Sequence, residues 1–252
     1  MTYCLGIKIA EGLIGLSDGR VTSGNQVTAA TKTVLLGPDG ARFFIMTSGL
    51  RSLRDKTLAY LQRHIRRSTN QRLPALLDVA SAYADCLRQV EKEDREALQQ
   101  SQLGFDLHAI IGGQLPDDPE PTMFLVYPEG NWVEVGERTP YLSIGATAYG
   151  KPILDRALRQ STSMRVALKL AYLSFDSTRF SAANVGFPID MTTYAAAERV
   201  WRHTQYDYDD LRDQRNWWNE NITKLAASMP DGPWVETLLS GTARPRLQVV
   251  QD

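Results

Sequence analysis

Short apolar runs with a period of two dominate the chain, and they are typical of β-strands that bury one face. Between residues 2 and 10, large apolar side chains alternate with small or polar ones, and the tight turn at Glu11-Gly12 leads into a second run. A tight turn implies that these first two strands pair antiparallel. The runs that predict strands cover residues 2–10, 13–18, 31–36, 42–47, 105–113, 123–127, 132–135 and 141–144, with one further strand pair within 184–194.

Apolar residues spaced three and four apart predict helices between these groups of strands. Gly, Pro and Asn gather where connections are expected: a polar loop at 19–25, a turn at 37–40 and a break at 70–74. The predicted helices cover residues 50–67, 74–102, 151–160 and 164–175, and a last amphipathic segment at 208–229 precedes a tail that contains Pro and Gly.

The order of these elements is strands, two helices, strands, two helices, strands. A doubly wound parallel sheet is disfavoured because its strands alternate with single helices. The order instead predicts two stacked antiparallel sheets with a helix pair on each outer face. We expect one domain over residues 1–252, with a Trp-rich helical extension from about residue 200. The tryptophans there either pack a terminal helix or form a subunit interface, and they are Trp201, Trp217, Trp218 and Trp234.

Composition narrows the function classes without naming one. Hydrophobic residues make up 43% of the chain and charged residues 23%, as in ordinary globular proteins. The 28 basic and 29 acidic residues nearly cancel, so no nucleic-acid partner is predicted. Two cysteines and three scattered histidines indicate neither a disulfide framework nor a metal or cofactor site. Without a membrane-length apolar run or a signal-peptide pattern, we expect a cytoplasmic protein with no membrane partner.

Thr2 is the main candidate for chemistry. If Met1 is removed, Thr2 carries both a hydroxyl and a free α-amine, which can act as nucleophile and base, since an α-amine has a pKa of about 7.7–8.0. Asp18 ends the second strand and Lys32 opens the third run, so both are expected beside Thr2. The lysine would lower the pKa of the hydroxyl and amine, and the carboxylate would keep the lysine protonated. Backbone amides at Ser48-Gly49 are candidates for an oxyanion hole.

A serine-hydrolase interpretation also has a motif. Gly15-Leu16-Ser17-Asp18-Gly19 matches the G-x-S-x-G nucleophile elbow. That motif requires a turn from a strand into a helix, and the residues after Gly19 predict a loop. We therefore reject Ser17 as a nucleophile.

The motifs together resemble a known family. Four features of the chain resemble the proteasome β-subunits: an N-terminal Thr, a strand-ending Asp with Arg two residues later, a Lys, and a short run with small residues before a helix. In this sequence they are Thr2, Leu16–Arg20, Lys32 and Met46–Gly49. Three later segments are similar to the bacterial ancestral β-subunit branch (Anbu), namely residues 144–156, 174–178 and 184–190. The resemblance covers nearly the whole chain.

This resemblance implies an α+β fold, the four-layer αββα sandwich of the N-terminal nucleophile hydrolases. It implies a threonine-type peptidase that acts on peptides or unfolded proteins within a homo-oligomer, either a ring or a helical stack, and it specifies no unfoldase partner. The site residues that it implies are Thr2 as nucleophile and base, Asp18 and Lys32 as charged support, Gly49 as oxyanion amide, and Asp176 as a later supporting aspartate whose serine companion is Ser177 or Ser181.

One position departs from the family pattern. Ala146 stands in Gly145-Ala146-Thr147, where proteasomes carry a supporting serine. Since its side chain cannot hydrogen-bond, we expect a proton relay that is weakened, or rerouted through Thr147 or water. Two other functions therefore stay open: a ring-forming scaffold with a silent site, and an amide-bond enzyme that acts on a small modified peptide.

Overall fold

The computed structural model describes residues 2–23, 26–37, 42–67 and 73–240. Contacts divide the chain into two compact units, residues 1–210 and residues 211–252, which are treated separately below. The predicted turn at 37–40 and break at 70–74 fall largely outside the described residues, as does Met1.

The first unit contains two five-stranded antiparallel sheets. One has the order β10-β1-β2-β11-β12, with bounds Tyr141–Gly145, Tyr3–Ile9, Gly12–Asp18, Ile189–Ala195 and Val200–Tyr206. The other has the order β5-β6-β7-β8-β9, with bounds Thr33–Leu36, Phe43–Gly49, Leu107–Gly113, Thr122–Val126 and Trp132–Glu134. The tight turn after β1 gives the antiparallel β1–β2 pair that the sequence predicts.

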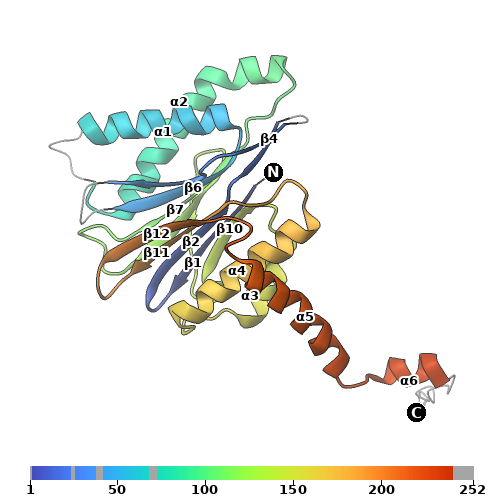
Figure 1. Ribbon diagram of the computed structural model, residues 1–252. Coiled ribbons are helices and arrows are strands. Elements are labelled where there is room, and N and C mark those ends of the chain that lie inside the picture. The colour runs from blue at the N-terminus through green and yellow to red at the C-terminus, as the bar shows by residue number, and fades with distance from the viewer. Residues whose placement is uncertain (1, 24–25, 38–41, 68–72, 241–252) are drawn as a thin grey trace, which may run out of the picture. The chain divides into compact units, whose positions relative to one another are not determined.

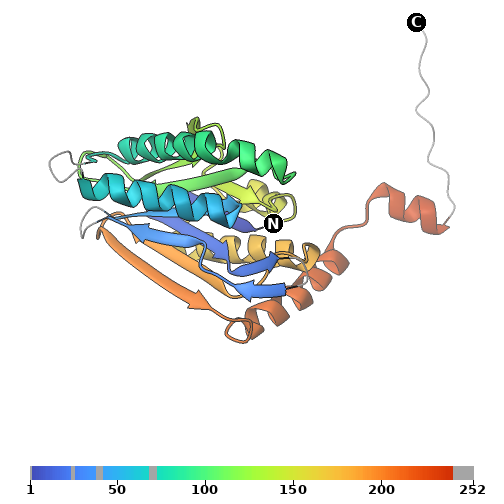
Figure 2. The ribbon, with the colours of Figure 1, turned by 90° about the horizontal axis from the view of Figure 1, so that it is seen from above.

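Helix pairs cover the outer faces of both sheets, as Figure 1 shows. Helices α1 (Arg51–Arg67) and α2 (Leu76–Gln100) pack on the sheet that contains β6 and β7, and they run beside each other when seen from above (Figure 2). Helices α3 (Lys151–Ala157) and α4 (Met164–Ser181) lie on the side of β1 and β2. The predicted αββα sandwich of antiparallel sheets between helix pairs is confirmed.

Side chains on the two faces of β6 pack into two different apolar clusters, and this explains how the layers are held together. Phe43 and Ile45 belong to the apolar cluster shared with the helices, which also contains Leu61 of α1. Phe44 and Met46 belong to the cluster between the two sheets. Because successive side chains of a strand point to opposite faces, this one strand supplies both cores. Each large apolar side chain that is fully buried contributes about 1.5–3 kcal/mol.

The structure corrects three sequence predictions in the first unit. The predicted loop at 19–25 begins with a strand, β3 (Arg20–Ser23), which pairs with β4 (Gln26–Ala29). The region 184–194 holds one strand, β11, rather than a pair, and its partner is β12. Trp201 lies in β12 and makes edge-to-face contact with Phe44, so it belongs to the sheet core rather than to a C-terminal extension.

The second unit is helical and exposes much apolar surface. Helix α5 (Arg212–Ser228) lies within the amphipathic segment predicted at 208–229, whereas the first residues of the extension expected from about residue 200 form the strand β12. A further helix, α6 (Pro233–Ser240), forms in the Pro- and Gly-containing tail, for which the sequence analysis predicted no element. Exposed large apolar side chains on this unit are Trp217, Ile222, Leu225, Met229, Trp234, Leu238 and Leu239. Among the described residues, no helix combines the length and apolar character needed to cross a membrane.

Candidate active site

The pairing of strands brings Thr2, Asp18 and Lys32 together. In the β1–β2 pair, Cys4 lies opposite Ser17, so the residue after Ser17 reaches the start of β1. In the β5–β6 pair, Thr33 lies opposite Met46, and Lys32 directly precedes that strand. The three residues therefore meet at one end of the stacked sheets, as the sequence predicts.

The Asp18 carboxylate is the hub of this cluster. Its Oδ1 accepts hydrogen bonds from Thr2 Oγ1 (2.6 Å), Tyr3 N (2.8 Å) and Lys32 Nζ (2.5 Å). Its Oδ2 accepts from the Gly186 amide at 3.3 Å. Lys32 Nζ also donates to the Arg20 carbonyl oxygen at 2.7 Å, which fixes the ammonium between two acceptors.

Burial makes the charges of this cluster effective. Asp18 is 0% exposed, Thr2 6% and Lys32 7%. Ion pairs removed from water interact more strongly and are screened less than surface pairs. Removing one partner of such a pair leaves an uncompensated buried charge. The Lys32 ammonium and the Thr2 hydroxyl therefore share one acceptor, Asp18 Oδ1, so a fixed positive charge lies close to the hydroxyl.

The backbone of Thr2 is held by the end of β10. The Thr2 carbonyl oxygen accepts a hydrogen bond of 2.7 Å from the Ala146 amide. Gly145 has φ +86°, and a Cβ at that position would lie 1.9 Å from the Thr2 carbonyl oxygen. Only glycine fits this close approach without strain. Ala146, the departure from the family pattern, is thus an immediate neighbour of Thr2.

Tyr3 anchors the start of β1 to the helix layer. Its hydroxyl and Ser174 Oγ of α4 share a hydrogen bond of 2.6 Å, and both residues are fully buried. Burial raises the pKa of the Tyr3 phenol, so the phenol remains neutral. Together with the Asp18 bond to the Tyr3 amide, this contact leaves Thr2 little freedom to move.

The thiol of Cys4 is a second kind of potential nucleophile close to the site. Burial raises the pKa of its thiol to about 12, and the Asp18 carboxylate adds to the rise. The Lys32 charge acts in the opposite direction without cancelling it. Because the thiolate is the reactive form of cysteine, Cys4 does not compete with the Thr2 hydroxyl at neutral pH.

Gly49 ends β6 at the same end of the sheets. The neighbouring Thr47 carbonyl faces the Cys4 thiol at 3.7 Å, which places this part of β6 beside the start of β1. Gly49 has φ +139°, and a Cβ there would lie 2.0 Å from the Asp106 carbonyl oxygen. Its role as an oxyanion amide stays a prediction.

Asp176 makes its contacts away from the cluster. It is buried in α4 and forms an ion pair of 2.6 Å with Arg179. Its companion candidates also lie on α4, with Ser177 half-buried and Ser181 exposed. Among the described residues, no hydrogen bond or ion pair joins Asp176 to Thr2, Asp18 or Lys32. The α4 residue that does reach the start of β1 is Ser174, which the motif comparison did not single out.

Two contributors to the site were missed because they give no signal in the sequence. The Gly186 amide and the Arg20 carbonyl act through the backbone, which any residue type provides. A hollow of about 610 Å³ beside them is lined by Arg20, Gly186 and neighbouring residues.

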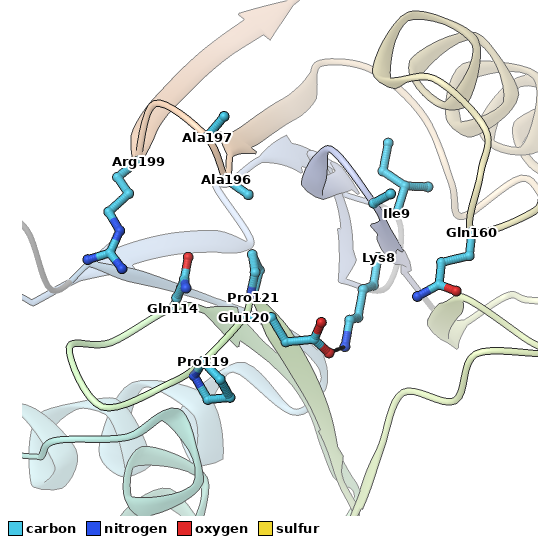
Figure 3. Close-up of a pocket in the computed structure, with 11 residues that line it drawn as sticks. Lys8, Ile9, Gln114, Pro119, Glu120, Pro121, Gln160, Ala196, Ala197 and Arg199 are labelled. Atoms are coloured by element: carbon cyan, nitrogen blue, oxygen red, sulfur yellow. Dashed lines mark hydrogen bonds and ion pairs between the residues drawn. The ribbon is translucent and has the colours of Figure 1, made fainter.

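The hollow drawn in Figure 3 belongs to the other end of the sheets. It has a volume of about 350 Å³ and is lined by Lys8, Ile9 and Ala10 at the end of β1, with Glu120 paired to Lys8 at 2.7 Å. Seven strand residues span about 20 Å, so this hollow is not part of the Thr2 cluster. Within the described residues, no three His, Cys, Asp or Glu side chains are grouped to hold a metal ion.

Solved structures that are similar to this chain include Anbu proteins. The Anbu Gly-1 mutant from Hyphomicrobium sp. strain MC1 has a TM-score of 0.83 and 28% identity, covering 92% of this chain and 99% of its own. Anbu from Yersinia bercovieri has a TM-score of 0.81 and 26% identity, covering 91% and 98%. The helical assembly of the Anbu complex from Pseudomonas aeruginosa gives a TM-score of 0.84 and 28% identity, covering 92% and 98%.

The sequence matches no family model and no curated protein. The structural neighbours nevertheless extend over nearly the whole of this chain and of their own. They confirm the resemblance to the Anbu branch of the proteasome β-subunit fold that the sequence motifs indicate.

Proposed function

We propose that this chain, whose structural neighbours are Anbu proteins, is a threonine-type peptidase that cleaves peptide bonds through Thr2 after removal of Met1. The single observation that carries the proposal is the Thr2 hydroxyl bound to Asp18 Oδ1 at 2.6 Å, with the Lys32 ammonium on the same oxygen at 2.5 Å. Once Met1 is removed, Thr2 supplies the nucleophile through its hydroxyl and the base through its α-amine.

The proposed reaction uses only groups of Thr2 and water. The neutral α-amine takes the proton of Thr2 Oγ1 while this oxygen bonds to the carbonyl carbon of the substrate. The resulting tetrahedral oxyanion collapses, the C–N bond breaks, and the α-ammonium returns the proton to the departing amine. Water, deprotonated by the same amine, then attacks the Thr2 ester. The bond between the acyl carbon and Oγ1 breaks, the α-ammonium returns its proton to Oγ1, and the acid product leaves.

Asp18 and Lys32 prepare the hydroxyl for this step. In the free site the hydroxyl donates to Asp18, which fixes its orientation. As the proton leaves, negative charge develops on Oγ1, and the nearby Lys32 ammonium stabilises this charge in a buried environment. The Gly49 amide is the proposed donor to the oxyanion of the substrate.

The proposal is tested by peptide hydrolysis with matched variants at residue 2. Wild type and Thr2→Ser, which keeps a hydroxyl and an amine, are expected to cleave a set of short peptide amides. Thr2→Ala is expected to lose the activity by a factor of about 10³ or more, since it removes the nucleophile. Equal rates for wild type and Thr2→Ala would overturn the proposal.

A silent scaffold is the second candidate, and Ala146 is the observation that favours it. This residue donates its amide to the Thr2 carbonyl, but its methyl side chain offers no hydrogen bond to the α-amine. If the protein is a silent scaffold, wild type and Thr2→Ala form the same assemblies. Neither protein then cleaves any of the peptide amides tested, and neither cleaves small modified peptides.

We also propose that the protein acts as a homo-oligomer. The second unit exposes Trp217, Leu225 and Leu238 at 59%, 67% and 80%, and exposed apolar groups of this size mark interaction surfaces. The Pseudomonas aeruginosa neighbour is a helical assembly. Sedimentation should show that Leu225→Glu or Leu238→Glu shifts the protein to smaller species, whereas Leu103→Glu outside this unit does not. An unchanged sedimentation profile would exclude this unit as the interface.

A further inference from the structure

The hollow in Figure 3 lies at the end of the sheets away from Thr2, where four connections meet. Its residues come from the end of β1, the segment between β7 and β8, the segment between α3 and α4, and the β11–β12 turn. Its volume of about 350 Å³ is within the range of small-molecule pockets. Much of its wall is apolar, formed by Ile9, Ala10, Pro119, Pro121, Ala196 and Ala197.

Backbone hydrogen bonds and one ion pair hold the walls of this hollow in place. The Ala196 amide donates to the Glu11 carbonyl oxygen at 3.0 Å, and the Ala10 amide donates to the Gln160 carbonyl oxygen at 2.9 Å. Lys8 Nζ on β1 contacts Glu120 Oε1 from the segment before β8 at 2.7 Å. Because these contacts join all four connections, the hollow is formed before any ligand arrives, which favours binding.

Arg199 has a backbone conformation that is unfavourable for its residue type. Ala195 pairs with Val200, so residues 196–199 form the turn between β11 and β12. Arg199, the last of them, has φ +53°, in the left-handed region that Gly and Asn adopt more readily. The turn alone would be better served by either of those residues. Because such outliers cluster at functional sites, the side chain of Arg199 calls for an explanation.

The guanidinium of Arg199 supplies a positive charge that is not compensated. Among the described residues, none forms a hydrogen bond or an ion pair with it. The preceding residue, Glu198, pairs with Arg202 at 3.0 Å instead. Of the other charged residues that line the hollow, Lys8 and Glu120 compensate each other. The unmatched charge in the wall is therefore positive, and it attracts an anion.

The groups around Arg199 narrow the kind of anion. A planar guanidinium presents parallel N–H donors that match a carboxylate. The Gln160 side-chain amide, which has no partner among the described residues, both donates and accepts hydrogen bonds, as a peptide group requires. Figure 3 shows Arg199 and Gln160 on different sides of the hollow, with the Lys8–Glu120 pair below them. A carboxylate, a peptide group and small apolar side chains together describe the carboxyl end of a peptide.

We propose that this hollow binds the carboxyl end of a short free peptide, with its carboxylate on Arg199 and its last peptide group on the Gln160 amide. Short free peptides are what the reaction proposed for Thr2 releases, and in this respect the inference rests on the proposed function. Binding itself needs no hydrolysis, because the length of β1, about 20 Å, separates the hollow from the Thr2 cluster. A peptide in the hollow therefore leaves the Thr2 site open.

Calorimetric titration of the full-length Thr2→Ala variant with trialanine tests the proposal, since this variant cannot consume the peptide through Thr2. The matched ligand is trialanine amide, which has the same size and lacks the carboxylate. Trialanine is expected to bind, and its amide to bind about tenfold or more weakly, because a charge-assisted pair is lost. Equal binding of the two ligands, or binding of neither, overturns the proposal. A longer peptide with the same carboxyl end that binds far more tightly than trialanine would identify a protein tail as the ligand and overturn the assignment to a free peptide.

Arg199→Asn, made in the same Thr2→Ala protein, separates a binding role from a structural one. Asn adopts the left-handed conformation more readily than Arg, so this variant is expected to unfold at the same temperature as its parent or higher. It is also expected to bind trialanine about tenfold or more weakly. Arg51→Gln is the control, since it removes one exposed positive charge next to Gly49, at the other end of the sheets, and should leave binding unchanged.

A folded Arg199→Asn variant that binds trialanine as tightly as its parent would overturn the role of Arg199. The outcome does not depend on catalysis, because every binding measurement is made without the Thr2 hydroxyl. Failure of wild type to cleave any peptide would count against the proposed peptidase alone.

Discussion

Lys32 is the residue on which both the stability and the chemistry of the site depend. Its ammonium compensates a carboxylate that is fully excluded from water. Lys32→Met keeps the apolar stem and leaves Asp18 uncompensated, so we expect a loss of about 3–5 kcal/mol in the free energy of unfolding. Denaturant unfolding measures this loss, with the exposed Lys92→Met as control. A loss as small as that of the control would show that the pair is not buried in solution.

Ala146 is the residue where the site differs from the proteasome pattern. A hydroxyl at this position would lie beside the backbone of Thr2, where it could relay a proton to the α-amine. Ala146→Ser is therefore expected to raise the peptidase rate by about tenfold, less than the roughly 10²–10⁴-fold that a direct general acid–base group contributes, because this hydroxyl only relays the proton. Ala148→Ser, at a nearby exposed position, should leave the rate unchanged. If Ala146→Ser is no faster than wild type, the missing serine does not limit the reaction.

At the residue scale, the sequence predicted the groups whose positions follow from strand ends. Thr2 directly precedes β1 and Asp18 ends the strand paired with it, so antiparallel pairing alone brings them together. The Gly186 amide could not be predicted in this way, since it is a backbone group delivered by a segment far along the chain.

At the element scale, α1 and α2 are joined by an ion-pair network that responds to pH. Lys56 Nζ contacts both Glu93 and Asp94 at 2.7 Å, and the Tyr60 hydroxyl donates to Glu93 at 2.9 Å. The Lys56 ammonium, with the Tyr60 hydroxyl, lowers the pKa of Glu93 to about 2 from 4.5. A carboxylate whose pKa is lowered by folding stabilises the folded state above its unfolded value, and that contribution is lost as pH falls toward 2.

Glu93→Gln should therefore unfold at a lower temperature than wild type at pH 7, and the gap should close as pH falls from about 4.5 to 2. Thermal unfolding at a series of pH values measures the gap. The control is Glu96→Gln on the same helix, since Glu96 does not take part in the Lys56 ion pairs. A gap for Glu93→Gln that stays constant would contradict the network.

The elements that the sequence missed share one physical property, which is weak hydrophobic patterning. Strand β12 is an edge strand whose residues are mostly exposed, so Arg202, His203 and Gln205 give no apolar alternation. Strand β3 is only four residues long. Helix α6 begins at a Gly-Pro step that predicts irregular structure. The central strands and the long helices, by contrast, have strong periodicity because they bury whole faces.

For the whole molecule, the same arrangement that creates the core also creates the site. The two sheets pack face to face, and the charged cluster lies at one end of their interface, where Lys32 from one sheet's edge meets Asp18 from the other. Tyr3 ties this end to α4, and the Gly186 amide adds a donor from the segment before β11. The fold thus holds the second residue of the chain in a buried, charged setting, which an ordinary N-terminus does not need.

The measurement that tests the central claim most directly is the mass of the purified protein before and after treatment with a peptide epoxyketone. The account predicts a mature chain that begins at Thr2, one reagent molecule added per chain, and fragment masses that place it on Thr2. A chain that retains Met1, or an adduct that forms equally well on Thr2→Ala, would contradict the assignment of Thr2 as nucleophile and base.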